Sequence, residues 1–367
     1  METAEHSNQI AFTETQLLAY NVATRCAASL SLCASIYMAV SAIRCRSRIY
    51  HRLILGLSTH LILYCCWHLY GSAAVPEGSP NSRGARGTTQ TCTAQGFFLQ
   101  LSFCVPLYYV CLSFYSFFAV RNNFDVVKYL WIEKWIHVGV HVFPVGSALY
   151  LLSIEAFNFS GNKSACWIDS IPYGCGDGTE VECTRGPQNI TQVASIFAAL
   201  PALFVLICPT CVMAALYCQV RRRQDRIRLQ SMEVAKQASL YLCALYWSYV
   251  FAIINNSFRW IADKNIFWLD IMGVVNLNLL GVYVLLIYLR FRKRSLNSGT
   301  PPAQSSLEGL TSIRSEVATD NAASEFNIFD GSNPTGEFAE FIFEGDAEDN
   351  EADMAESAKW KTIQDHI

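Results

Sequence analysis

VASIFAALPALFVLICPTCVMAALYCQV, residues Val193–Val220, is a run of 28 residues without a single charged side chain. About 20 mostly apolar residues are enough for a helix to cross the hydrocarbon layer of a membrane. This run therefore predicts a membrane-spanning helix, and six further segments have the same character: Leu17–Ile43, Leu53–Val75, Phe97–Val120, Trp135–Ile154, Ala238–Ile261 and Ile266–Leu289. A transmembrane β-barrel is excluded, because its strands would be segments of about ten residues with alternating polarity. The sequence predicts an all-α membrane protein, a bundle of seven transmembrane helices.

The composition of the whole chain agrees with this interpretation. Of 367 residues, 52% are hydrophobic and only 16% are charged, whereas about a quarter of the residues in a soluble domain are charged. The net charge of −3 conceals an asymmetry, because 15 of the 30 acidic residues follow Arg294. We therefore expect three parts: a short extracellular N-terminus (residues 1–16), a seven-helix transmembrane domain (17–294), and a disordered, acidic, Ser/Thr-rich cytoplasmic tail (295–367).

The positions of Lys and Arg predict the orientation of the chain. Loops on one side of the predicted bundle carry seventeen of these residues, and loops on the other side carry six. Basic loops remain in the cytoplasm, so the N-terminus is expected outside, in a multi-pass protein of the plasma membrane. The first sixteen residues contain no Lys or Arg and do not resemble a cleavable signal peptide. Three glycosylation sequons lie in the predicted exterior loop between the fourth and fifth helices, at Asn158, Asn162 and Asn189.

Four of the 15 cysteines lie on the predicted exterior side: Cys92, Cys166, Cys175 and Cys183. An even number in an oxidising compartment favours two disulfides, and four cysteines allow three pairings. Cys175 and Cys183 enclose a Gly-rich turn and suit a local disulfide, which leaves Cys92 to join Cys166 and tie the loop to the third helix. A zinc site is the weaker alternative, because the loop supplies no histidine. We expect neither a metal nor another cofactor.

Two of these cysteines belong to motifs that resemble a receptor family. Cys92–Gln100 (CTAQGFFLQ) followed by Pro106–Tyr115 (PLYYVCLSFY) resembles the third helix of the cyclic-AMP-receptor-like and secretin-like G-protein-coupled receptors of protists. Cys166–Ile168 looks like the Cys-Trp of their second outer loop, and Lys236–Tyr241 is similar to the start of their sixth helix. The resemblance implies a receptor that binds an extracellular ligand and activates a heterotrimeric G protein. The seventh helix departs from the cyclic-AMP-receptor pattern, so cyclic AMP is not supported as the ligand.

Polar and aromatic side chains within the spans are the candidates for ligand binding. Those on the second helix recur on one helical face, and two on the sixth helix are four residues apart. Arg25 and Asp270 are both in the outer half of the bundle, where they could form a pair, either as a structural clasp or as a ligand contact. The full set is Arg25, His60, Tyr64, Trp67, His68, Trp167, Asn255, Arg259, Asp270 and Asn276. The alternative for each residue is interhelical hydrogen bonding that holds the bundle together.

Basic residues on the predicted cytoplasmic side are the candidates for G-protein coupling: Arg121, Arg221, Arg222, Arg223, Arg226 and Arg290. The alternative is that they set the topology and attract anionic membrane lipid. The tail contains Ser and Thr residues that suit phosphorylation, which implies a receptor kinase and an arrestin-like protein as partners. No nucleic-acid partner is expected.

Three other functions are compatible with a bundle of apolar helices. Photochemistry through a retinal Schiff base is excluded, because Ile266–Leu289 contains no lysine. A transporter is less favoured, since the sequence shows no internal repeat. A metal-dependent membrane hydrolase would use His137 and His141, which lie on one helical face, but zinc needs a third ligand at that depth. We therefore expect a receptor and not an enzyme.

Overall fold

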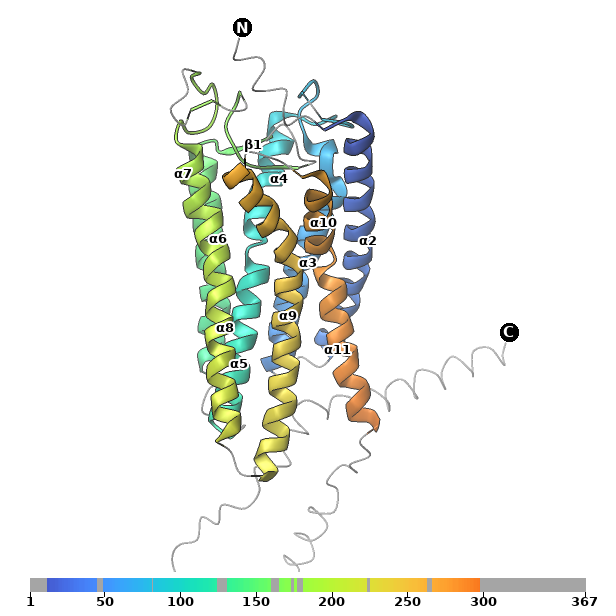
Figure 1. Ribbon diagram of the computed structural model, residues 1–367, viewed down its shortest axis with the longest axis vertical. Coiled ribbons are helices and arrows are strands. Elements are labelled where there is room, and N and C mark those ends of the chain that lie inside the picture. The colour runs from blue at the N-terminus through green and yellow to red at the C-terminus, as the bar shows by residue number, and fades with distance from the viewer. Residues whose placement is uncertain are drawn as a thin grey trace, which may run out of the picture.

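The computed structural model describes residues 12–44, 49–80, 82–123, 131–159, 165–172, 175–176, 181–222, 225–262 and 266–297, and of residues 225–230, 259–262 and 292–297 it describes the backbone alone. Long helices run side by side and give an elongated bundle (Figure 1). Six of them are long and apolar enough to cross a membrane, and a bent pair makes up a seventh candidate span. The chain is therefore a multi-pass helical membrane protein.

All seven predicted apolar segments lie on helices. The spans are α2 (Glu14–Arg44), α3 (Ile49–Tyr70) with the 3-10 turn η2 (Gly71–Ala74), α4 (Thr89–Leu101) with α5 (Cys104–Arg121), α6 (Ile132–Ser153), α7 (Ile190–Ala194) with the π-helical turn η4 (Ser195–Ala199) and α8 (Leu200–Arg221), α9 (Asp225–Ala262), and α10 (Phe267–Asn278) with α11 (Leu280–Asn297). Several helices extend beyond the predicted segments, because polar residues can continue a helix outside the hydrocarbon layer. Residues 1–11 of the predicted N-terminus and 298–367 of the predicted tail lie outside the described residues.

The outward-facing surface of the bundle carries large apolar side chains. Leu30, Val142 and Leu200 are 61%, 64% and 59% exposed, on three different helices. Side chains such as Leu53 and Leu245 are fully buried between the helices. Water would disfavour extensive exposed apolar surface, whereas the acyl chains of lipids solvate it. This distribution is the one expected of helices that face lipid on one side and each other on the opposite side.

Proline residues account for irregularities in two spans. The third span is interrupted at Ser102 and Phe103, one turn before Pro106. A proline has no N–H for the carbonyl four residues earlier, and its ring clashes with that carbonyl. The fifth span widens into the π-helical turn η4 just before Pro201, which is a common way for a helix to accommodate an extra residue.

The seventh span is broken between α10 and α11 with a bend of 46°, where the sequence predicts one continuous helix. Side chains bond to the backbone on both sides of this break. Asn276 donates to the Met272 carbonyl at 2.8 Å, and Asn278 donates to the Val274 carbonyl at 2.8 Å. The Gly281 N–H bonds to Ser31 Oγ of α2 at 3.0 Å. At Gly281 the backbone N–H of the seventh span is therefore bonded to a side chain of α2.

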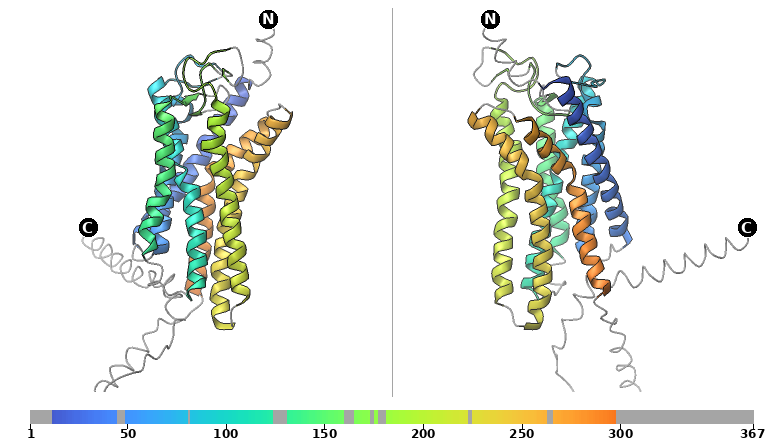
Figure 2. Two further views of the ribbon diagram at one scale, coloured as in Figure 1. Left: turned by 90° about the vertical axis from the view of Figure 1, so that its left-hand side faces the viewer. Right: turned by 45° about the vertical axis from the view of Figure 1, so that its right-hand side comes forward.

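The longer loops that the structure describes and two short strands gather at one end of the bundle, which we call the capped end (Figure 2). Strand β1 (Phe157–Phe159) pairs antiparallel with β2 (Cys166–Ile168), and Phe159 lies opposite Cys166. Both disulfides are at this end. The opposite end carries the start of α3 and α6 and the last turns of α5, α8 and α11.

Candidate functional site

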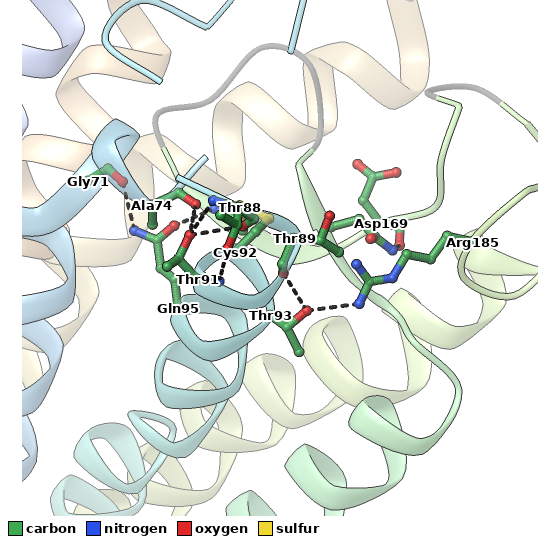
Figure 3. The surroundings of a disulfide bond; sticks show 12 residues. Gly71, Ala74, Thr88, Thr89, Thr91, Cys92, Thr93, Gln95, Asp169 and Arg185 are labelled. Carbon is green, nitrogen blue, oxygen red and sulfur yellow. Dashed lines mark hydrogen bonds between the residues drawn. A yellow bond between two sulfur atoms is a disulfide. The ribbon is translucent and has the colours of Figure 1, made fainter. Parts of the chain in front are cut away.

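The structure contains both predicted disulfides, and one of them fixes the cap to the third span. Cys92 on α4 is joined to Cys166 on β2, and Cys175 is joined to Cys183 within the loop that follows. Below the first disulfide lies Gln95, which is fully buried (Figure 3). Its amide donates to the carbonyls of Trp67 and Gly71 at 3.1 and 3.0 Å, and its oxygen accepts the Cys166 N–H at 2.8 Å. Gln95 thus bonds to two carbonyls at the end of α3 and holds β2 against α4.

A second buried glutamine, Gln100, connects the cap to two further helices. The Trp167 indole N–H donates to Gln100 Oε1 at 3.2 Å. The Gln100 amide donates to Ser147 Oγ of α6 at 3.0 Å and to the Phe197 carbonyl at 3.2 Å. Phe197 lies four residues before Pro201, so its carbonyl has lost the usual helical partner. Gln100 supplies a replacement, and the candidate ligand residue Trp167 is thereby fixed to the third span.

A hollow of about 440 Å³ lies beside the outermost turns of α4. It is lined by Thr89, Gln90, Thr93, Ala94, Phe97, Phe98, Leu152 and Arg185. The guanidinium of Arg185 donates to Thr93 Oγ1 at 2.8 Å (Figure 3). It also lies 3.5 Å from a carboxylate oxygen of Glu155. None of the ten side chains predicted to bind a ligand lines this hollow, so the sequence pattern and this concave surface indicate different places.

The predicted ligand residues fall into separate groups. Asn255 of α9 donates to Asp270 Oδ1 of α10 at 3.2 Å, and its oxygen accepts the Ile266 N–H at 3.3 Å. Arg25 lies on the exposed side of α2, and within the described part of the chain it makes no ion pair with Asp270. The proposed Arg25–Asp270 pair is therefore absent here, and Asn255 takes the place of the arginine. The Arg259 side chain lies outside the described residues.

Four candidate ligand residues share one face of α3, but this face contacts two different helices, α4 and α6. Trp67 stacks on Phe98 of α4 with ring centroids 5.1 Å apart, and Tyr64 packs on His68 at 4.3 Å. His60 points instead to α6, where its Nε2 is 3.0 Å from His141 Nε2. Asn276 accepts the Tyr283 hydroxyl at 2.7 Å within the broken seventh span. The Trp67 and His60 contacts agree with the alternative of interhelical packing and bonding, whereas the Tyr64–His68 and Asn276–Tyr283 contacts lie within single spans.

A polar network crosses the opposite end of the bundle. Tyr50 of α3 and Tyr241 of α9 share a hydrogen bond of 2.8 Å between their hydroxyls, and Gln237 donates to Tyr50 at 2.8 Å. Arg52 of α3 forms an ion pair with Glu133 of α6, including an Nη2 to Oε2 contact of 2.6 Å. Because α3 bonds to both α6 and α9 here, these contacts hold this end of the bundle closed.

The predicted coupling arginines lie at the same end. Arg121, Arg221, Arg222 and Arg290 are exposed at the last turns of α5, α8 and α11. Arg221 also packs its guanidinium on the Tyr217 ring, 5.1 Å from the centroid. Arg223 and the side chain of Arg226 lie outside the described residues. The basic groups therefore surround the end at which Tyr50 and Tyr241 join two helices.

The three sequons differ in accessibility. Asn158 is fully buried in β1, and its Nδ2 donates to the carbonyls of Glu155 and Asp169 at 2.8 and 2.9 Å. Since a glycan is attached to that nitrogen, the structure does not accommodate the predicted glycan at Asn158. Asn189 is exposed at the start of α7, and Asn162 lies outside the described residues.

We expect glycopeptide mapping of protein from a eukaryotic host to find Asn189 modified and Asn158 unmodified. The Asn189→Gln variant should lose one glycan in mass. An Asn158 peptide that carries a glycan would show that β1 forms differently during synthesis, because the modified nitrogen could not make both of its hydrogen bonds.

Neither a comparison with protein-family models nor a comparison with curated protein sequences finds a match to this chain.

The sequence did not predict the roles of Gln95 and Gln100, although both lie in the segment Cys92–Gln100 that resembles the receptor family. The available signal was their chemistry, because an amide inside an apolar span needs hydrogen-bond partners. It also missed a cluster at mid-span. The ligand atoms of His60, Cys104 and His141 lie within 4.8 Å of one another, although the three residues come from three helices.

Proposed function

We propose that this protein is a G-protein-coupled receptor, with the capped end outside the cell and the opposite end in the cytoplasm. The observation that carries the proposal is the disulfide from the start of the third span to the loop between the fourth and fifth spans, in a bundle with up to seven candidate spans. This link positions a hairpin over the end of the bundle. The excess of Lys and Arg at the other end agrees with a cytoplasmic location.

A signalling mechanism follows from the contacts at the two ends. A ligand at the capped end would contact either the hairpin of β1 and β2 or the helix α4. Gln95 and Gln100 of α4 bond to β2, so a movement of one would be transmitted to the other. At the opposite end, a G-protein helix can enter only if α9 separates from α3. The Tyr50–Tyr241 and Gln237–Tyr50 hydrogen bonds resist that separation. Exposed arginines such as Arg221 and Arg222 would then face the negative C-terminal end of the partner helix.

The proposal can be tested without knowledge of the ligand. The Tyr50→Phe, Tyr241→Phe variant removes both hydroxyls that hydrogen-bond α3 to α9 but keeps the aromatic rings. We expect it to raise ligand-free nucleotide exchange several-fold on at least one Gα class, measured in lipid nanodiscs. A further change of Arg221, Arg222, Arg223 and Arg226 to Gln should return exchange to the rate of the G protein alone.

The control for charge is an Arg83→Gln, Arg86→Gln variant, which removes basic groups at the capped end and should leave exchange unchanged. Amounts of folded, inserted protein must be equal among the variants, because basic loops also set the topology. If neither the wild type nor the tyrosine variant accelerates exchange on any Gα class, the receptor assignment is wrong. If the arginine variant is fully active, these arginines serve topology and lipid contact only.

The remaining parts of the proposal follow from the receptor assignment. The cell membrane would be the plasma membrane, and the natural ligand would reach the capped end from outside. Phosphorylation of the tail by a receptor kinase would create a site for an arrestin-like protein. Catalysis has no part in this mechanism.

A further inference from the structure

We propose that His60, Cys104 and His141 form a binding site for a single copper(I) ion at mid-depth in the bundle. The three residues come from α3, from the first turn of α5 and from α6. Their ligand atoms lie within 4.8 Å of one another, and the two Nε2 atoms are 3.0 Å apart. The site is separate from the cap and from the basic end, so it does not rest on the receptor function.

The spacing suits a three-coordinate ion. Metal–nitrogen and metal–sulfur bonds of about 2.0 and 2.3 Å place the donors of a trigonal site roughly 3.5 to 3.8 Å apart. The two Nε2 atoms are closer than this and all three ligand atoms lie within 4.8 Å of one another, so small side-chain rotations would fit the site to an ion. Cys104 is fully buried, and both histidines are half-buried.

The surroundings orient two of the three ligands. His141 Nδ1 is 2.6 Å from the His137 carbonyl, which assigns the proton to Nδ1 and leaves the Nε2 lone pair directed at the cluster. His60 Nδ1 is buried without a hydrogen-bond partner. Cys104 Sγ contacts the Val140 carbonyl at 3.5 Å, which Pro144 deprives of its helical N–H partner. This contact holds the sulfur on the side of α6.

The fourth side is closed by Tyr108. Its ring centroid is 6.0 Å from that of His60 and 6.3 Å from that of His141, and its hydroxyl is 3.0 Å from His137 Nδ1. Gly56 makes this position possible, because a Cβ there would lie 2.5 Å from the Tyr108 hydroxyl. The ring therefore leaves three donors for the ion and limits the access of a fourth.

The donor set and the depth favour Cu(I) over Zn(II). Thiolate and imidazole ligands suit both ions, but structural zinc takes four ligands. His60 lies near the middle of α3, between Ile49 and Tyr70, where a net charge is most costly. Cu(I) bound by one thiolate and two neutral imidazoles is electrically neutral, whereas Zn(II) with the same ligands carries one positive charge. On binding, the S–H bond of Cys104 breaks, a sulfur–copper bond forms, and the proton passes to the buffer.

The test is copper retention by the purified full-length protein in detergent. Accessible thiols are first capped with N-ethylmaleimide, since ten free cysteines are present among the described residues. The protein is then loaded anaerobically with Cu(I) and dialysed against bathocuproine disulfonate. We expect the wild type to keep one copper ion per chain, with one sulfur and two nitrogen ligands by X-ray absorption. Cys104→Ser, His60→Gln and His141→Gln should each lose it.

Two matched controls lie on the same helices. Cys111→Ser and His68→Gln remove a thiol from α5 and an imidazole from α3 outside the cluster, and both should keep the ion. Circular dichroism and intact disulfides establish folding, and if Cys104→Ser does not fold, the two histidine variants decide. Copper retention that is equal in all variants would overturn the site. Retention of Zn(II) in place of Cu(I) would overturn the assignment of the metal.

Discussion

Replacement of Cys92 and Cys166 together by serine is expected to destabilise the folded protein by about 4 kcal/mol, because the lost bond closes a long segment of chain. The two cysteines are 74 positions apart. Without the bond, β2 is held to α4 mainly by Gln95 and by the Trp167 contact to Gln100. We expect a large fall in the unfolding temperature in detergent, together with increased protease cleavage between residues 156 and 190.

The second disulfide is the internal control for this prediction. Cys175 and Cys183 are only 8 positions apart, so their replacement should cost about 2.5 kcal/mol by the same loop-closure argument. It should leave the pairing of β1 with β2 intact. Equal destabilisation by the two double variants would contradict the view that the first disulfide fixes the cap to the bundle. Peptide mapping without reduction checks that each variant keeps the other disulfide.

The Gly281→Val variant is expected to disrupt the packing of the broken seventh span against α2. A Cβ at position 281 would lie 2.4 Å from Ser31 Oγ and 3.0 Å from the Ser31 carbonyl oxygen. The backbone of α2 cannot move away locally, and the Gly281 N–H bond to Ser31 Oγ would be lost as well. We expect a loss of about 3 kcal/mol or more in the free energy of unfolding, at the upper end for overpacked interiors.

Gly146→Val on α6 is the matched control, because a Cβ there has no atom within 4 Å. It introduces the same side chain into a helix of another span and should leave the unfolding temperature nearly unchanged. Both variants are compared by thermal unfolding and by the yield of monodisperse protein in detergent. Equal stability of the two would show that α11 can shift away from α2 without cost.

The number and position of the spans could be predicted because lipid imposes a simple rule on sequence. A sufficiently long apolar run that crosses the membrane must be helical, so segments such as Val193–Val220 can be recognised as spans from the sequence alone. The irregularities inside the spans obey other rules. Pro106 indicates a distortion in the third span, but the seventh span has no proline, and at its break the Gly281 N–H bonds to Ser31 Oγ of α2, a contact between spans that the local sequence does not reveal.

The candidate site was less predictable, because it depends on which helices face each other. Spacing within a helix places His60 and Trp67 on one face, but that face borders both α4 and α6, so the two side chains have different partners. Arg25 and Asp270 have compatible depths, yet Arg25 lies on the exposed side of its helix. His60, Cys104 and His141 share no local pattern, since each comes from a different span.

The bond between Gln100 and the Phe197 carbonyl has a consequence for how this sequence can evolve. Pro201 creates the free carbonyl, and Gln100 on another helix satisfies it. Loss of the glutamine alone leaves the Phe197 carbonyl without this hydrogen bond in an apolar environment. Loss of the proline alone restores a backbone N–H at position 201, which competes with Gln100 for the same carbonyl. Simultaneous exchange avoids both of these costs, although the bonds of Gln100 to Ser147 and Trp167 are still lost. Positions 100 and 201 should therefore diverge in step, as a compensated pair, despite their distance along the chain.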